Sequence, residues 1–225
     1  MTFDDKLNKI RLIAGKMMSC SAHDCDHVDR VYNLCLMLAK GQKVDLQVLE
    51  IAALLHDIGR EAEHNDKTGK IDHAKVGAQM AEKILKDLGV DDEKIECVKE
   101  CILSHRFRGK ILPKSLEAKI LFDADKLDTL GAIGIARSYV WVGKNNAKIY
   151  TDRDLNSYVN ENIEGGVFGR IKDKTKHSPQ IEFDLKFGKI KEKLFTKKAK
   201  KIATQRTKFY SDFLKRLEKE IKGKL

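Results

Sequence analysis

Apolar residues recur every three or four positions along most of the chain, which is the spacing that places them on one face of an α-helix. The first such pattern predicts an amphipathic helix over residues 3–18. Its apolar positions are Phe3, Leu7, Ile10, Ala14 and Met17. Further patterns predict helices over residues 24–40, 45–59, 72–88, 91–104, 115–130, 131–143, 152–162, 182–195 and 197–222. No segment shows the alternation of a strand, so the sequence predicts an all-α fold, a compact bundle of many helices.

The predicted helices are bounded by residues that favour helix ends. Asp45 and Asp72 stand where a carboxylate accepts hydrogen bonds from the first backbone N–H groups of a helix, and Gly41 follows another predicted helix. The polar segments at residues 60–70 and 164–179 are predicted to be connections. We expect the first of them to border a binding pocket, because such loops commonly carry binding residues.

Residues 181–225 carry most of the net charge. The formal charge of the chain is +10, and this segment contributes +9 from fifteen Lys and Arg against six Asp and Glu. Apolar positions near one face of the last predicted helix indicate that it packs on the body of the protein. They are Ile202, Phe209, Phe213, Leu217 and Ile221. The basic surface either attracts nucleic acid or another polyanion, or is a solvated helix face.

Length and composition are those of a globular protein. With 225 residues, of which 42% are hydrophobic, we expect a core over residues 1–162 and a basic helical extension over residues 163–225, packed on the same domain. No long apolar run and no signal-peptide layout are present, so we expect a soluble, unprocessed, cytoplasmic protein that does not enter a membrane. The five cysteines form no Cys-x-x-Cys pair, which favours reduced and mostly buried thiols over a zinc or disulfide role.

The segment LLHDIGR places His56 and Asp57 side by side at the end of an apolar run. Buried ionisable groups must be paired or bound to a metal ion, so an apolar helix that ends in an imidazole and a carboxylate favours a metal site. Further candidate ligands follow a regular order along the chain. They are His27, His73, His105, Asp123 and Asp125.

The order of these residues resembles the HD superfamily of metal-dependent phosphohydrolases, whose signature is one His, a His-Asp doublet and a distal Asp in an Ala-Asp-x-Leu setting. The corresponding residues are His27, His56, Asp57 and Asp125. Asp123 and Asp125 lie about 200° apart on a helix and cannot face one point together, and the segment ADKL selects Asp125. The resemblance implies an all-helical fold and a divalent metal ion at these four residues. Imidazole and carboxylate ligands suit manganese, magnesium, iron, cobalt, nickel or zinc.

Charged residues near the proposed ion are candidates for substrate binding and catalysis. Arg30, Arg60 and Lys126 each lie within four residues of a proposed ligand and are predicted to neutralise phosphate oxygens. Glu61 follows Asp57 by four residues, on the same face if the helix persists, and is predicted to orient water or transfer a proton. The predicted catalytic residues are thus Asp57, Glu61 and Lys126. For the two arginines, the lysine and the glutamate, a surface salt bridge is the alternative role.

His73 and His105 decide between one metal ion and two. Their placement resembles the extra histidines of the HD-GYP phosphodiesterases and of the di-iron HD oxygenases, in which a binuclear centre shares the Asp of the doublet. The Gly-Tyr-Pro element is absent, so we expect both residues in the pocket wall, where they contact phosphate; a second ion is the alternative. His64 and His177 have no such context and are predicted at the surface, and His23 is an intermediate case.

The resemblance extends over most of residues 20–220 and points to nucleotides. The segments AALLHDIGR, DADKLDTLGAIGIAR and Thr196–Arg206 closely resemble a bacterial and archaeal HD subgroup associated with nucleotide hydrolysis, including pyrophosphate release from nucleoside triphosphates. This implies a hydrolase of phosphate esters or anhydrides that acts on a small phosphorylated molecule, as a nucleoside triphosphate pyrophosphohydrolase or a nucleotidase. The alternatives are a phosphodiesterase acting on a cyclic nucleotide or RNA, and a non-catalytic nucleotide or nucleic-acid binding module.

Overall fold

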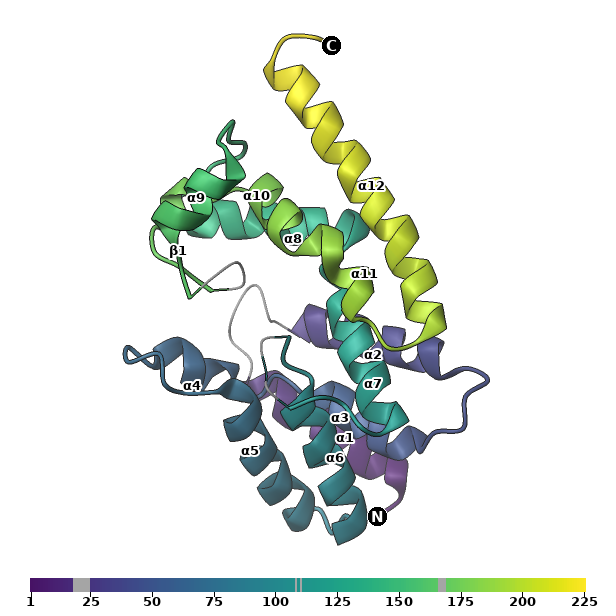
Figure 1. The fold of residues 1–225 in the computed structure, drawn as a ribbon. Helices are drawn as coiled ribbons and strands as arrows, with labels where there is room; N and C mark the ends of the chain where they lie inside the picture. The colour runs from purple at the N-terminus through teal and green to yellow at the C-terminus, as the bar shows by residue number, and fades with distance from the viewer. Residues whose placement is uncertain (18–24, 108, 110, 166–168) are drawn as a thin grey trace. The chain divides into compact units, whose positions relative to one another are not determined.

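The computed structural model describes residues 1–17, 25–107, 109, 111–165 and 169–225, which are mostly helical (Figure 1). They form two compact units, Met1–Asp125 and Lys126–Leu225. The all-α prediction is confirmed. The predicted division into a core over residues 1–162 and a basic extension over residues 163–225 stays a prediction.

The first unit is organised around one apolar helix, α3. Its helices are α1 (Phe3–Met17), α2 (Cys25–Ala39), α3 (Leu46–Leu55), α4 (Arg60–Asn65), α5 (His73–Asp87), α6 (Asp92–Ser104) and most of α7 (Leu116–Leu127). Most of the side chains of α3 are buried, and α1, α2 and α6 pack against it. Helix α5 packs on α6 (Figure 1). An unbroken apolar run forms a helix here because neighbours cover it on several sides.

Side-chain caps begin the helices of the first unit where the sequence predicts them. The Asp45 carboxylate accepts hydrogen bonds from the backbone N–H groups of Gln47 and Val48, and Asp72 accepts one from Ala74. Asp91 caps α6 in the same way. The caps satisfy backbone donors that have no partner within the helix, and they therefore set where each helix starts.

The predicted connection over residues 60–70 is wrong in its first half, because Arg60–Asn65 forms the short helix α4. Glu61 and Glu63 in its first turn interact favourably with the helix dipole. The connection is confined to the residues after α4, where the Asp66 carboxylate accepts backbone hydrogen bonds from Thr68, Lys70 and Ile71.

The second unit consists of helices and one very small sheet. Its elements are α8 (Gly131–Lys144), α9 (Leu155–Asn162), β1 (Ile163–Glu164), β2 (Arg170–Ile171), η1 (Lys174–Lys176), α10 (Pro179–Leu185), η2 (Phe187–Lys189), α11 (Ile190–Lys193) and α12 (Lys197–Ile221). The two strands pair antiparallel, with Ile163 opposite Ile171. The sequence does not reveal them, because two residues are too few to show an alternation.

The helix predicted over residues 182–195 is broken into three pieces. It starts earlier, at Pro179, because the Ser178 hydroxyl caps it and proline suits the first helical position. It is interrupted at Lys186, whose backbone leaves the helical region. The predicted apolar stripe on α12 is also partly wrong, because Phe209 and Ile221 are 55% and 49% exposed.

The segment from Thr196 to Arg206 joins α12 to the rest of its unit. Thr196 caps α12 through the backbone N–H of Ala199. The small side chains of Ala199 and Ala203 are buried, and α12 packs against α8. The Arg206 guanidinium donates a hydrogen bond of 2.7 Å to the carbonyl oxygen of Leu127, at the end of α7. The motif therefore has a structural role, whatever further role it serves.

His177 is buried, so its predicted place at the surface is wrong. Its Nδ1 lies 2.8 Å from the hydroxyl of Tyr158, and its Nε2 lies 3.3 Å from the carboxylate of Glu182. Asn162 donates to the same hydroxyl and to the carbonyl oxygen of Asp173. These bonds tie the end of α9 to α10, and the sequence does not show them because the partners are far apart along the chain.

Among the described residues, no helix combines the length and the apolar character that crossing a membrane requires.

Candidate metal centre

His56 is held at the end of α3 in an orientation that leaves one ring nitrogen available. The helix ends at Leu55, and His56 is its C-terminal cap. Its Nδ1 donates a hydrogen bond of 2.9 Å to the carbonyl oxygen of Ala53. Because a carbonyl oxygen only accepts, the proton of the neutral ring is on Nδ1 and the lone pair is on Nε2, which is the form that binds a metal.

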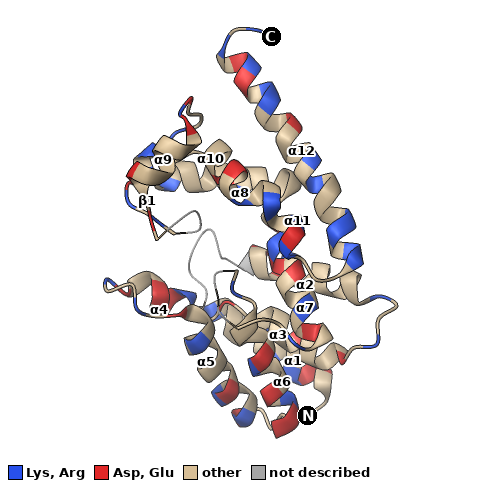
Figure 2. Cartoon of the chain, viewed as in Figure 1, with Lys and Arg blue, Asp and Glu red and all other residues tan. Residues whose placement is uncertain are grey.

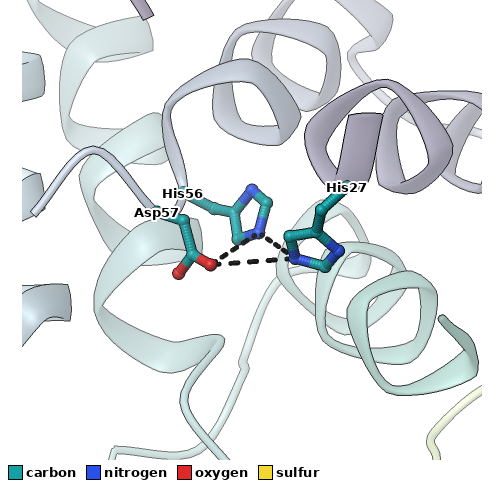
Figure 3. Close-up of side chains that lie close together, drawn as sticks. All are labelled: His27, His56 and Asp57. Carbon is teal, nitrogen blue, oxygen red and sulfur yellow. Dashed lines mark hydrogen bonds and ion pairs between the residues drawn. The ribbon is translucent and has the colours of Figure 1, made fainter. Parts of the chain in front are cut away.

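His27 of α2 and Asp57 complete a group of three donors with His56 (Figure 3). The Nε2 atoms of the two histidines are 3.4 Å apart. The Oδ2 atom of Asp57 lies 3.7 Å from Nε2 of His27 and 3.6 Å from Nε2 of His56. Ligands of one ion are about 3.0 to 3.4 Å apart when each lies about 2.1 Å from it, so the three atoms fit a metal site after small adjustments.

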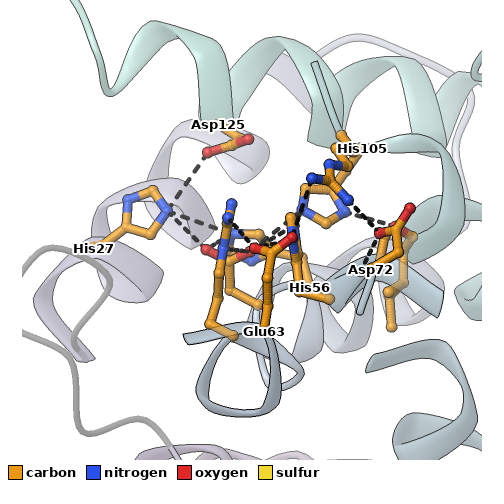
Figure 4. Close-up of polar contacts among 12 residues, drawn as sticks. His27, His56, Glu63, Asp72, His105 and Asp125 are labelled. Carbon is orange, nitrogen blue, oxygen red and sulfur yellow. Dashed lines mark hydrogen bonds and ion pairs between the residues drawn. The ribbon is translucent and has the colours of Figure 1, made fainter. Parts of the chain in front are cut away.

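Asp125 brings a fourth donor from α7. Its Oδ1 atom lies 3.5 Å from Nε2 of His27 (Figure 4), and its side chain is nearly buried. We call His27, His56, Asp57 and Asp125 the first donor group. This contact supports Asp125 as the distal ligand, although Asp123 is buried as well.

The other oxygen of Asp57 faces a second donor group, which consists of Asp57, His73 and His105. Its Oδ1 atom lies 3.6 Å from Nε2 of His73 and 3.3 Å from Nε2 of His105. The two Nε2 atoms are 3.3 Å apart. One carboxylate therefore separates two groups of imidazoles, each with its Nε2 atoms directed toward it.

The histidines of the second group are oriented by hydrogen bonds at Nδ1, as His56 is. His105 caps α6 and donates from Nδ1 to the carbonyl oxygen of Ile102 at 2.6 Å. His73 is the first residue of α5, and its Nδ1 lies 2.9 Å from the carboxylate of Glu63. Both rings therefore present the Nε2 lone pair to Asp57.

Two glycines bring the turn after Asp57 against α5. A Cβ atom on Gly59 would clash with the carbonyl oxygen of His73 and would lie 2.7 Å from the backbone nitrogen of Gly77. Gly77 itself approaches the backbone nitrogen of Gly59. The absence of a side chain at Gly59 lets the His-Asp turn and the start of α5 meet, and this approach places His73 beside Asp57.

Arg60, Glu63 and Arg106 surround the second group with alternating charges. The Nε atom of Arg60 donates to Oδ1 of Asp57 at 2.9 Å, and its Nη1 atom lies 3.3 Å from Glu63. Arg106 bridges Glu63, at 3.0 Å, and Asp72, at 2.8 Å. Burial alone would raise the pKa of Glu63, but hydrogen bonding and attraction from His73 and the two arginines lower it to about 2.

One histidine of each group, His56 and His73, is neutral near pH 7. Burial lowers the pKa of His56 to about 3 and that of His73 to about 4, although nearby carboxylates act in the opposite direction. A neutral imidazole is the form that coordinates metal, so these two residues need not lose a proton before an ion binds.

Arg30, Lys126 and Glu61 were also predicted at the site, and the structure shows the position and exposure of each. Arg30 lies on α2, one turn after His27, and is partly buried. Lys126 is 6% exposed and follows Asp125 on α7. Glu61 is exposed, and the turn at residues 56–59 interrupts the helix that was expected to align it with Asp57. Its catalytic role stays a prediction. His23 lies outside the described residues.

Sequence reasoning missed Glu63 and Arg106. Glu63 lies three residues after Arg60, a spacing that favours contact on a helix, but this signal is too common to single it out. Arg106 immediately follows His105, and its contacts with α4 and the start of α5 depend on packing between distant segments.

Comparison with known sequences settles the family. The model of the HD domain matches residues 25–130. YpgQ of Bacillus subtilis (strain 168), an uncharacterized protein, is 31% identical over 207 residues, which cover 90% of this chain and 86% of YpgQ. The chain belongs to the HD-domain family. The two matches confirm the resemblance inferred from the His and His-Asp signature.

Solved structures share the HD-domain fold over nearly the whole chain. A predicted HD superfamily hydrolase from an uncultured Thermotogales bacterium is 30% identical, with a TM-score of 0.61, and the match covers 96% of this chain and 91% of that one. B. subtilis YpgQ in complex with ADP is 24% identical, with a TM-score of 0.72, over 98% and 97% of the two chains. The likeness therefore extends beyond the segment that the HD-domain model matches.

Proposed function

We propose that this HD-domain protein is a divalent-metal-dependent phosphohydrolase that acts on a nucleotide. The observation that carries the proposal is the first donor group, in which buried His27, His56 and Asp57 converge and Asp125 approaches His27. Two similarities support it: the Thermotogales relative is named a hydrolase, and YpgQ has been crystallised with ADP.

In this proposal His27, His56, Asp57 and Asp125 hold the ion. A bound divalent ion lowers the pKa of a coordinated water and polarises a phosphoryl oxygen. The Nδ1 bond from His56 to Ala53 keeps the ring in the binding tautomer. Burial excludes bulk water from the donors, which strengthens their interaction with the ion.

Positive side chains would bind the phosphates. Arg60 is held beside Asp57 by its Nε hydrogen bond, so part of its guanidinium is already fixed at the site before substrate arrives. Arg30 and Lys126 remain candidates for phosphate contacts through their proximity in sequence to His27 and Asp125. Nδ1 of His73 and of His105 is engaged in a hydrogen bond, which leaves Nε2 as an acceptor. The two rings therefore suit a hydrogen bond from water or from a protonated phosphate oxygen better than one to a fully ionised phosphate.

The proposal is tested by incubating the protein with a panel of nucleoside mono-, di- and triphosphates in the presence of manganese and identifying the products by mass spectrometry. We expect cleavage of at least one nucleotide by the wild type and none by His56→Ala. Inactivity of metal-loaded wild type across the panel would contradict a nucleotide substrate. Release of pyrophosphate rather than orthophosphate would distinguish a pyrophosphohydrolase from a nucleotidase.

A second candidate function, binding or cleavage of RNA, is favoured by one observation on α11 and α12. We call Lys191, Lys193, Lys197, Lys200 and Lys201 the basic cluster. Three of these lysines lie in the first turns of α12, where the helix dipole disfavours positive charge. Within the described part of the chain, no ion pair joins any of the five to a carboxylate.

In the second half of α12, by contrast, positive side chains are paired with carboxylates. There, ion pairs four residues apart join Lys208 to Asp212, Arg216 to Glu220, and Lys222 to Glu218. Figure 2 shows the contrast, with positive residues gathered on the first half of the helix and both signs present on the second. An uncompensated cluster that lowers helix stability is consistent with an anionic partner.

Fluorescence anisotropy with a labelled RNA oligonucleotide tests this candidate. We expect Lys197→Glu/Lys201→Glu to abolish binding and Lys215→Glu/Lys219→Glu, which changes the charge equally on the second half of α12, to retain most of it. Wild-type affinity should fall steeply with salt. Equal losses in the two variants would indicate non-specific attraction, and binding that survives His56→Ala without RNA cleavage would favour a binding module.

A further inference from the structure

The second donor group places three acceptor atoms together. Oδ1 of Asp57 and the Nε2 lone pairs of His73 and His105 lie between 3.3 and 3.6 Å from one another, and all three side chains are buried. Acceptors at this distance repel unless a cation or a proton lies among them. The arrangement therefore requires positive charge at this position.

Arg60 supplies such a charge from the adjacent helix. Its Nε atom donates to Oδ1 of Asp57, the same oxygen that faces His73 and His105. Its Nη1 atom contacts Glu63, and the Glu63 carboxylate in turn accepts from His73. The guanidinium is thus fixed between two carboxylates and cannot lose its charge near neutral pH.

The two oxygens of Asp57 consequently have different surroundings. Oδ2 faces His27 and His56, whose group has Asp125 as a further carboxylate. Oδ1 faces the Nε2 atoms of two imidazoles and one guanidinium. A divalent ion in the second group would have to share Oδ1 with Arg60 and would be repelled by the guanidinium. In the first group, Asp125 adds a second negative charge that attracts the ion.

We propose that Arg60 takes the place of a second metal ion at Asp57, His73 and His105, and so keeps the centre mononuclear. The inference rests on the proposed metal site of the first donor group. It assigns Arg60 a role in setting metal stoichiometry, in addition to any contact with phosphate. Removal of the guanidinium leaves three converging acceptors, which form a second site for manganese.

Metal stoichiometry tests the inference without reference to activity. Wild type and variants are saturated with manganese, freed of excess metal by gel filtration and measured by mass spectrometry for metal per chain. We expect one equivalent in wild type and two in Arg60→Ala. Electron paramagnetic resonance should show an isolated manganese ion in wild type and a spin-coupled pair in the variant.

Two further variants identify the cause. Arg106→Ala is the matched control, because Arg106 contacts the same Glu63 but bridges it to Asp72 and not to Asp57. It should retain one equivalent. Arg60→Ala/His105→Ala should return to one equivalent, because the second group then lacks a donor. Arg60→Met, which keeps the aliphatic volume, replaces Arg60→Ala if the latter does not fold.

The outcomes separate this inference from the proposed function. One equivalent in wild type and in both Arg60 variants would overturn the role of Arg60 and leave the first donor group intact. Two equivalents in wild type would overturn it as well. An absence of bound manganese in every folded variant would contradict the metal site itself.

Discussion

At the scale of single residues, the site depends on which ring nitrogen of each histidine already makes a hydrogen bond. Nδ1 of His56 and of His105 donates to a carbonyl oxygen three residues earlier, and this leaves Nε2 as an acceptor in both. Asp57 lies between the groups that these histidines help to form. Its two oxygens face different sets of imidazoles, so one substitution at Asp57 affects both groups.

Asp57→Asn should abolish metal binding and turnover together. The amide keeps the size of the side chain but removes the negative charge that offsets a divalent ion, and loss of a charged ligand in a buried site is not compensated by water. Metal content and nucleotide hydrolysis measured on the same sample check this outcome. Wild-type metal content and activity in Asp57→Asn would rule out the assignment, and Glu93→Gln, at an exposed carboxylate of α6, serves as the comparison.

At the scale of elements, close contacts between helix ends set the geometry of the donors. The turn that carries Asp57 touches the first turns of α5 at Gly59 and Gly77. These contacts involve backbone atoms, so they cannot adjust by rotation of a side chain. The position of His73 relative to Asp57 therefore depends on the absence of a side chain at Gly59.

Gly59→Ala should lower the free energy of unfolding by about 1 to 3 kcal/mol, because the added methyl group overlaps the backbone of α5. Urea unfolding measures the change, and manganese binding should weaken in the same variant. Gly143→Ala on α8 is the control, since no atom outside the adjacent helix backbone lies within 4 Å of the added Cβ. It should leave stability unchanged or raise it by up to about 1 kcal/mol.

The buried contacts of α10 predict an acid-sensitive step in stability. Burial would raise the pKa of Glu182, but attraction to Lys186 and a hydrogen bond from His177 overcome it and lower the pKa from 4.5 to about 2. A carboxyl group whose pKa is lower in the folded state than in the unfolded state stabilises the protein at pH values above its unfolded-state pKa. This contribution is lost as the pH falls through its folded-state pKa.

Wild type should accordingly lose on the order of 2 kcal/mol of stability between about pH 5 and pH 2 through Glu182, a value reduced to allow for solvent contact. Glu182→Gln should lack this component. Urea unfolding at a series of pH values provides the measurement. An unchanged difference between wild type and variant across the range would show that the ion pair has no effect on acid sensitivity.

At the scale of the whole molecule, the donors belong to one unit and the basic cluster to the other. Both donor groups lie within Met1–Asp125, and the basic cluster lies on α11 and α12 of Lys126–Leu225. Binding of an ion is therefore expected to stabilise the first unit directly. Ligand binding to the folded state contributes about 2.7 kcal/mol when the free ligand is at one hundred times its Kd.

Hydrogen exchange with and without manganese should show this division. Addition of the ion should slow exchange at the start of α2, the end of α3 and the end of α7, where His27, His56 and Asp125 lie. The second half of α12 should exchange at the same rate in both conditions, because its ion pairs are local. Protection confined to α12 would contradict a metal site in the first unit.

The sequence by itself determined what depends on neighbours along the chain. Helical periodicity predicted the all-α fold, and Asp45 and Asp72 marked helix starts because a cap acts within three residues. The order His27, His56, Asp57 and Asp125, with its local motifs, indicated the family, and the comparisons confirm that family. Short pieces, such as β1 and β2, were below the length at which a pattern is visible.

Only the tertiary structure decided what depends on packing between distant segments. It placed Asp125 beside His27 and divided the oxygens of Asp57 between two groups. It also placed Glu63 against His73 and left Glu61 exposed, because a turn after His56 changes which residues of α4 face the site. These contacts join atoms from different helices, and their distances follow from how buried faces fit together, which no local pattern along the chain encodes.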